Sequence, residues 1–319
     1  MWTEADMSLW TGRRDGDAVD HRRWHQLVEA LPDTAELNGA DTVLGFACDE
    51  GVRRNQGRVG AAAGPAALRR ALAQLPGPRG RRLLDAGDVN CRDGELEAAQ
   101  NELAQRVADI LQRGGRPLVL GGGHEVAWGS FLGIQTALKG AVDRLGIVNF
   151  DAHFDLRDPA QGASSGTPFR QIAQWCEYRG QAFNYLPVGI NPAANTRALY
   201  EYARRQGVVW LEDRECVVSA LPRLTPIIDG FIAPLEHLYL TICLDAFPAG
   251  VAPGVSAPGV PGLCPHAGLA LIGEVVGACA RHGVEIVLLD IAEMNPAYDR
   301  DGITARWAAR LVLEALGQG

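Results

Sequence analysis

Apolar and polar positions divide this chain into two kinds of segment. Short apolar, β-branched runs predict strands at residues 42–47, 117–120, 145–150, 186–190, 208–211, 238–244 and 284–289. Longer alanine- and leucine-rich stretches between them predict helices at residues 64–75, 95–112, 126–138, 197–205, 267–281 and 304–316. Strands that are apolar on both faces and separated by helices indicate a parallel sheet covered on each side. The pattern therefore predicts an α/β fold.

Composition narrows the class of protein. The chain has 319 residues, of which 47% are apolar and 21% are charged, so it can bury a large core. No internal repeat or long linker divides the sequence into two domains. We therefore predict one domain over residues 1–319. A net charge of −8 gives no general attraction for nucleic acid or anionic lipid. No apolar run reaches the ~18 residues of a membrane helix, and the polar N-terminus is unlike a signal peptide, so a soluble, cytoplasmic protein without nucleic-acid or membrane partners is expected.

Chemically capable side chains follow four of the predicted strands. They are His124, Asp151, His153, Asp155, Asp245 and Glu293. Ligands of parallel sheets bind at the carboxyl ends of the strands, where neighbouring strands end side by side. These strand ends therefore carry the candidate chemistry.

Asp151, His153 and Asp155 follow one strand at spacing i, i+2, i+4. In an extended segment this spacing points all three side chains to one face. Such a group is costly after a buried strand unless a cation compensates it, although a solvated acidic loop is the alternative. His124 and Asp245, at two further strand ends, favour a metal site. Carboxylate and imidazole ligands suit manganese, with iron, cobalt and zinc as alternatives, and indicate metal-assisted hydrolysis.

Two other motifs exclude further classes. The seven cysteines are scattered, odd in number and form no CxxC pair, which argues against a disulfide framework or a structural zinc site. The three glycines before His124 do not extend to GxGxxG, so they do not predict a dinucleotide-binding loop.

The strand-end motifs occur in a specific order: GGGHE, FDAHFD, LD followed by PAGVAPGVSAP, and LDIAEMNP. In this order they resemble the ureohydrolase (arginase/agmatinase) superfamily. The resemblance extends from about Gly45 to the C-terminus and includes Asn55, Gly57, Arg58 and the stretch GAAAGPAALRRAL. Residues 1–40 then form an N-terminal segment specific to one family.

Within the superfamily, three stretches resemble the formimidoylglutamase family: WTGR at 10–13, SGTPFR at 165–170 and APGVSAP at 252–258. The resemblance implies a three-layer αβα fold around a central parallel sheet and a centre of two Mn²⁺ ions. It also implies hydrolysis of N-formimidoyl-L-glutamate to L-glutamate and formamide, a step of histidine degradation. A homo-oligomer is implied as well.

Carried over by motif, the resemblance assigns metal-binding roles to five residues. His124 would bind one ion and His153 the other, Asp151 would bridge the two, and Asp155 and Asp245 would each bind one ion. Asp155 would also help carry a proton to the departing amine.

Glu293 has two interpretations. The resemblance places it in the substrate pocket, where its carboxylate would accept hydrogen bonds from the cationic formimidoyl group. The alternative is a turn or helix-start residue before Asn295 and Pro296.

Cys243 departs from the SxDxD pattern of arginases and agmatinases, because it occupies the position of a second bridging aspartate. It points the same way as Asp245, two residues on. A thiolate would bind or bridge metal, although sulfur suits zinc or iron better than manganese. A neutral thiol would weaken the hold on the second ion.

A second departure is the loop GASSGTPFRQ, which lacks the histidine of related guanidino hydrolases. Ser165, Thr167 and Arg170 offer hydroxyls and a guanidinium instead, and these suit a substrate with an acidic tail. The alternative for Arg170 is an exposed arginine at a helix start.

Two other functions remain open at this stage. One is a ureohydrolase that acts on a guanidino compound and releases urea. The other is a non-catalytic relative that binds a ligand or a protein, with Cys243 as its only support. Product analysis separates the first alternative, since it yields urea in place of formamide.

Overall fold

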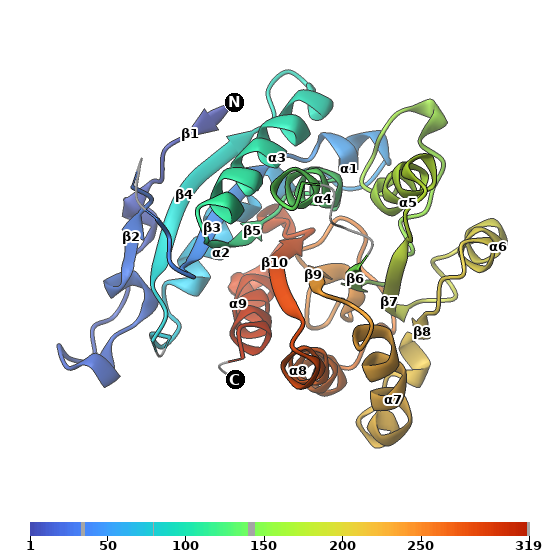
Figure 1. Cartoon of the computed structure of the whole chain (residues 1–319). Helices are drawn as coiled ribbons and strands as arrows, with labels where there is room; N and C mark the ends of the chain where they lie inside the picture. The colour runs from blue at the N-terminus through green and yellow to red at the C-terminus, as the bar shows by residue number, and fades with distance from the viewer. Residues whose placement is uncertain (33–35, 79, 140–143, 318–319) are drawn as a thin grey trace.

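A ten-stranded, mostly parallel sheet runs through the computed structural model, which describes residues 1–32, 36–78, 80–139 and 144–317 (Figure 1). The strand order is β1-β4-β3-β5-β10-β9-β6-β7-β8, with β2 paired to β4. The strands are β1 (Trp2–Thr3), β2 (Val28–Ala30), β3 (Asp41–Ala47), β4 (Leu83–Asn90), β5 (Arg116–Leu120), β6 (Leu145–Phe150), β7 (Asn184–Ile190), β8 (Leu211–Glu212), β9 (His237–Cys243) and β10 (Glu285–Ala292).

Helices cover both faces of this sheet (Figure 1). The helices are α1 (Glu50–Arg54), α2 (Gly64–Leu72), α3 (Leu96–Gln112), α4 (Val126–Ala137), α5 (Pro168–Arg179), α6 (Arg197–Arg205), α7 (Leu221–Ile232), α8 (Pro265–His282) and α9 (Ile303–Ala315). One apolar cluster packs α3, α4, α5 and α6 against one face, and a second packs α2, α7, α8 and α9 against the other. The predicted three-layer αβα fold is confirmed.

Three strands of the sheet, β1, β2 and β4, were not predicted from the sequence. β1 runs antiparallel to its neighbour, the longer strand β4. Its sequence LLDAGDVN places Asp85 in the interior, which is unusual for a strand. Arg69 of α2 compensates this charge, with Nε 2.8 Å from Asp85 Oδ2, and a partner so distant in sequence leaves no local pattern.

Other predicted boundaries shift or fail. The predicted strand 208–211 was wrong for its first three residues, because the strand found there is Leu211–Glu212. Helix α7 was not predicted, since it carries Pro222 and Pro226, yet packing against α8 outweighs that weak propensity. No helix in the described part of the chain is long and apolar enough to cross a membrane.

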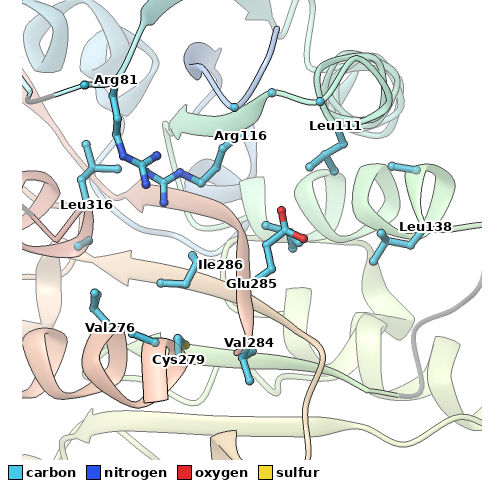
Figure 2. A pocket seen from close by; sticks show the side chains of 18 residues that line it. Arg81, Leu111, Arg116, Leu138, Val276, Cys279, Val284, Glu285, Ile286 and Leu316 are labelled. Atoms are coloured by element: carbon cyan, nitrogen blue, oxygen red, sulfur yellow. The ribbon is translucent and has the colours of Figure 1, made fainter. Parts of the chain in front are cut away.

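The centre of the sheet fixes the position of the functional groups. Strands β5, β10, β9 and β6 are consecutive neighbours and all parallel, so their carboxyl ends lie at one edge. At the opposite edge, the amino ends of β5 and β10 border a second cavity between the two helical layers (Figure 2).

Candidate metal centre

The predicted metal ligands lie at the carboxyl ends of neighbouring strands. His124 follows β5, Asp151 follows β6 and Asp245 follows β9. β6 and β9 pair in register from Leu145 to Phe150, which places the residues after them beside one another. The structure therefore brings together side chains that are about 120 residues apart in the chain.

The first group of ligand atoms surrounds the ring of His124. Its Nδ1 lies 2.9 Å from Asp151 Oδ2 and 3.0 Å from Asp155 Oδ2. The ligand atoms of His124, Asp151 and Cys243 all lie within 4.8 Å of one another, and all three residues are buried. Imidazole, carboxylate and thiol groups thus converge on one point.

The second group shares Asp151 with the first. His153 Nδ1 lies 3.4 Å from Asp151 Oδ1 and 3.2 Å from Asp245 Oδ2. The ligand atoms of these three residues also lie within 4.8 Å of one another. The two oxygens of Asp151 therefore face different histidines, which is the arrangement of a carboxylate that bridges two ions.

Neighbouring side chains hold these ligands in place. Thr241 Oγ1 is 3.0 Å from His124 Nε2, so this contact occupies one ring nitrogen and leaves Nδ1 facing the carboxylates. Asn149 Nδ2 donates to Asp151 Oδ2 at 3.1 Å, and the His153 backbone N–H donates to Asp151 Oδ1 at 2.7 Å. Such contacts orient ligands before a metal arrives.

The electrostatics of the site call for a cation. Burial opposes the charged histidine, but Asp151 and Asp155 raise the pKa of His124 well above its ordinary value. Burial and the charge of Asp151 raise the pKa of Asp155 to about 6. The buried Oδ1 of Asp245 has no hydrogen-bond partner among the described residues. Protons on the histidines balance this cluster in the absence of metal, and metal ions would replace them.

Cys243 is a thiol in this arrangement. Burial, followed by the charges of Asp151 and Asp245, raises the pKa of Cys243 well above its ordinary value. A metal ion reverses that balance, because a coordinated thiol loses its proton.

A cavity of about 250 Å³ is lined by five of the candidate ligands, which are His124, His153, Asp155, Cys243 and Asp245. The cavity therefore gives a small molecule access to both groups of ligand atoms.

Comparison with known proteins places the chain among relatives. Residues 40–317 match the family model described as "Arginase family". The chain belongs to the arginase family. It is 51% identical to a formimidoylglutamase of Ralstonia nicotianae over 316 residues, which covers 98% of this chain and 95% of that protein. It is 49% identical to one of Aeromonas hydrophila, with 96% of each covered. The predicted resemblance to ureohydrolases is confirmed.

Solved structures of arginase-family proteins share the fold. The formimidoylglutamase of Bacillus subtilis superposes with a TM-score of 0.79 at 21% identity, covering 97% of this chain and 93% of that one. The formiminoglutamase of Trypanosoma cruzi, crystallised with Mn²⁺, gives a TM-score of 0.74 at 23% identity, covering 89% and 94%.

Glu293 stands in the wall of the cavity, beyond the end of β10. Its Oε1 accepts a hydrogen bond of 2.8 Å from the His124 backbone N–H, and its backbone has a positive φ of 70°. Burial, with the charges of Asp245 and Glu125, raises the pKa of Glu293 to about 8. A cationic group in the cavity would stabilise the ionised carboxylate.

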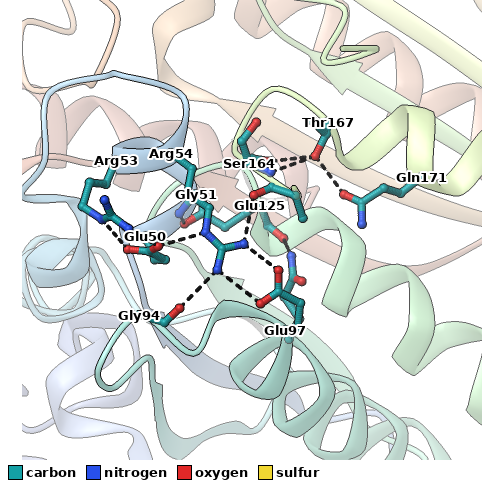
Figure 3. A network of polar contacts seen from close by, with 12 residues as sticks. Glu50, Gly51, Arg53, Arg54, Gly94, Glu97, Glu125, Ser164, Thr167 and Gln171 are labelled. Carbon is teal, nitrogen blue, oxygen red and sulfur yellow. Dashed lines mark hydrogen bonds and ion pairs between the residues drawn. The ribbon is translucent and has the colours of Figure 1, made fainter. Parts of the chain in front are cut away.

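Of the three residues predicted to contact an acidic tail, only Ser165 lines the cavity, where it accepts a hydrogen bond from Asn55 Nδ2 at 3.1 Å. Thr167 does not line the cavity. Its hydroxyl contacts Ser164 and donates a hydrogen bond to Gln171 Oε1 at 2.9 Å (Figure 3), so it already has partners within the protein.

Arg170 also lies outside the cavity lining. Its Nη2 is 2.7 Å from Asp158 Oδ2, and its guanidinium stacks on the ring of Tyr202 at 4.4 Å from the centroid. The structure therefore does not support the predicted substrate contact of Arg170.

Two other arginines line the cavity and were not predicted as substrate-binding residues. Arg157 is exposed, and no hydrogen bond or ion pair of its guanidinium occurs within the described ranges. Arg58 donates to the carbonyl of Pro253 at 3.2 Å and stacks on Tyr298. Arg157 follows Asp155 by two residues and so continues the i, i+2 spacing of Asp151, His153 and Asp155. This spacing is the one sequence signal that could have indicated a role for Arg157 at the site.

Glu125, next to His124, is buried without a cationic partner in the described structure. Its Oε1 accepts a hydrogen bond of 2.9 Å from the Gly51 N–H, in the network around α1 (Figure 3). Burial raises its pKa from the ordinary value of 4.5 to about 7. The folded chain therefore holds a proton on Glu125 at pH values where the unfolded chain has released it.

Replacement of this carboxyl should change how stability depends on pH. Between pH 4.5 and 7, Glu125 is protonated in the folded state more often than in the unfolded state. The free energy of unfolding of the wild type therefore falls as pH rises through this range. Glu125→Gln lacks this loss. We therefore expect the free energy of unfolding of Glu125→Gln, measured relative to that of the wild type, to increase by about 3 kcal/mol between pH 4 and pH 8. Urea denaturation in chelator measures this, with Glu177→Gln on the exposed face of α5 as control. Parallel curves for wild type and Glu125→Gln would contradict the assignment.

Proposed function

We propose that this chain hydrolyses N-formimidoyl-L-glutamate to L-glutamate and formamide. Relatives of 47–51% identity over nearly the whole chain bear the name formimidoylglutamase, which supports the proposal. The reaction adds one water across the formimidoyl carbon and breaks its bond to the glutamate nitrogen. The formimidoyl carbon leaves as formamide, and the nitrogen becomes the amine of glutamate.

The observation that carries the proposal is the polarity of the cavity. Its lining includes members of both groups of ligand atoms, the carboxylate of Glu293 and the guanidinium of Arg157, which has no partner in the described structure. A substrate that carries a cationic amidine and carboxylates would find an opposite charge for each of them in this lining. A guanidino substrate without an acidic tail would leave Arg157 unused.

The two groups of ligand atoms would hold two Mn²⁺ ions, because their nitrogen and oxygen ligands suit manganese; the sulfur of Cys243 is the one ligand that suits it less well. His124, Asp151, Asp155 and Cys243 would hold one ion, and Asp151, His153 and Asp245 the other. Bound ions would supply positive charge that stabilises the transition state and lowers the pKa of water. Cys243 would enter the first group as thiolate.

Two carboxylates of the chain perform the proton and charge chemistry. Glu293 accepts hydrogen bonds from the cationic formimidoyl group through the oxygen not already bonded to the His124 N–H. Asp155 faces the cavity, and its carboxylate would take a proton and deliver it to the departing amine.

The acidic tail would bind at the rim. Arg157 would pair with a substrate carboxylate, and Asn55 and Ser165 would donate hydrogen bonds beside it. This assignment replaces the one predicted for Thr167 and Arg170.

The decisive experiment is product analysis on purified protein. Formamide should appear from N-formimidoyl-L-glutamate, about two Mn²⁺ should be present per chain by elemental analysis, and chelation should stop turnover. Urea from agmatine or 4-guanidinobutanoate, without formamide, would assign the chain to guanidino hydrolysis. Absence of both products in Mn²⁺-loaded protein would favour a non-catalytic relative.

Loss of the rim arginine should weaken substrate binding. For Arg157→Met we expect KM for N-formimidoyl-L-glutamate to rise about tenfold, with kcat within about threefold, because a carboxylate contact far from the reacting carbon is lost. Steady-state kinetics measures both constants. Arg170→Met is the matched control and should leave KM within about twofold. A larger effect at Arg170 than at Arg157 would restore the original assignment.

A further inference from the structure

The stretch APGVSAP at residues 252–258 reaches the cavity at the metal centre through Ser256 and Ala257. The metal ligands, Glu293 and Arg157 account for the proposed hydrolysis without either residue. Ser256 is only 7% exposed, although it lines the cavity. A buried hydroxyl calls for a hydrogen-bond partner, and a substrate in the cavity is one candidate.

Contacts from two sides hold this stretch in the cavity wall. The backbone N–H of Arg58 donates to the carbonyl of Ser256 at 3.5 Å, and Nη2 of Arg58 donates to the carbonyl of Pro253 at 3.2 Å. On the other side, the backbone N–H of Gly254 donates to Thr304 Oγ1 at 2.9 Å. The backbone that carries the Ser256 hydroxyl is therefore in place before a substrate enters.

The hydroxyl of Ser256 lies beside the carboxylate of Glu293. Ser256 Oγ and Glu293 Oε2 are both buried, and neither makes a well-formed hydrogen bond to another residue of the described structure. Burial raises the pKa of Glu293, and the Ser256 hydroxyl opposes that rise, so the two groups are neighbours. Both residues line the cavity. Two adjacent polar atoms are thus available to a ligand at one place in the wall.

Glu293 can offer a substrate only one of its two oxygens. Its Oε1 already accepts the 2.8 Å hydrogen bond from the His124 backbone N–H. A carboxylate with both oxygens free can accept two N–H groups of an amidinium cation side by side, but Glu293 has only Oε2 left for this. A cationic formimidoyl group has two N–H donors on its terminal nitrogen alone. It therefore needs a second acceptor next to Glu293 Oε2, and Ser256 Oγ is in that position.

We propose that Ser256 is a substrate-binding residue that completes the acceptor pair for the cationic formimidoyl group, an inference that rests on the proposed function. One N–H of the group would bind Glu293 Oε2 and another would bind Ser256 Oγ, while the hydroxyl proton of Ser256 turns to Glu293. A serine hydroxyl can accept and donate at the same time, so it can make both contacts. The two acceptors together would fix the plane of the formimidoyl group in the cavity.

Steady-state kinetics of Ser256→Ala in Mn²⁺-loaded protein tests the proposal. We expect kcat/KM for N-formimidoyl-L-glutamate to fall about tenfold, because a hydrogen bond to a charged group is lost. L-Glutamate lacks the formimidoyl group, so its inhibition constant should stay within about twofold of the wild-type value. Elemental analysis should find the same metal content. Equal weakening of L-glutamate and of the substrate would show a distorted cavity and refute the contact.

A double-mutant cycle with Glu293→Gln tests whether the two side chains act on the same group. In the Glu293→Gln background, Ser256→Ala should lower kcat/KM by less than about threefold, because the partner of the hydroxyl proton has lost its charge. An undiminished tenfold loss in that background would show that Ser256 acts independently of Glu293 and would overturn the shared acceptor pair.

The matched control is Ser130→Ala in α4. The Ser130 hydroxyl is also buried without a well-formed hydrogen bond in the described structure, but it does not line the cavity. This variant should keep kcat/KM within about twofold of the wild type. Wild-type protein that releases no formamide would refute the proposed function and this inference together. Formamide release by the wild type, with kcat/KM unchanged in Ser256→Ala, would refute this inference alone.

Discussion

Replacement of Asp151 by asparagine should remove both the metal pair and the activity. Its two oxygens face different histidines, Oδ2 at 2.9 Å from His124 Nδ1 and Oδ1 at 3.4 Å from His153 Nδ1. An amide supplies one weak oxygen ligand and no charge, so neither group of ligand atoms keeps its affinity. We expect metal content to fall from about two ions per chain to one or fewer, and formamide release to fall by about 10³-fold or more. Elemental analysis and turnover on the same sample measure both.

The control for this variant is Asp158→Asn, in the same segment but exposed and paired with Arg170. It should keep full metal content and nearly full turnover. If Asp151→Asn still held two ions, Asp151 would not be the bridging ligand, and the assignment of both ligand groups would need revision.

That the candidate metal ligands lie close together could be predicted from the sequence, because parallel strands arrange their carboxyl ends in a simple way. Neighbouring parallel strands must end side by side, so polar groups directly after apolar runs necessarily meet. His124, Asp151 and Asp245 required no further knowledge of packing. That residues 1–319 form one domain remains a prediction.

The sequence does not show which side chains already have a partner in the fold. Thr167 has a hydroxyl suited to substrate, but Ser164 and Gln171 occupy it. Arg170 and Arg157 are both loop-region arginines in the sequence, and only the structure shows that Arg157 lines the cavity whereas Arg170 lies outside it and pairs with Asp158. β4 was missed for a related reason, since Arg69 neutralises its buried Asp85 from another element.

Glutamine in place of Glu293 should separate substrate recognition from metal binding. The amide oxygen of glutamine can still accept the 2.8 Å hydrogen bond from the His124 N–H, so the loop before α4 should keep its shape. The negative charge that faces the cationic formimidoyl group is lost. We expect kcat/KM to fall about 10²-fold, the upper end of the effect of a buried charge-assisted hydrogen bond, with metal content unchanged.

Glu293→Asp is the matched comparison, because it keeps the charge and shortens the reach. It should recover part of the loss if charge is what matters, whereas a purely structural role of the side chain would leave glutamine more active than aspartate. Elemental analysis of both variants guards against an indirect effect through His124. Loss of metal from Glu293→Gln would show that the carboxylate acts by positioning that ligand, and its contact with substrate would then have to be abandoned.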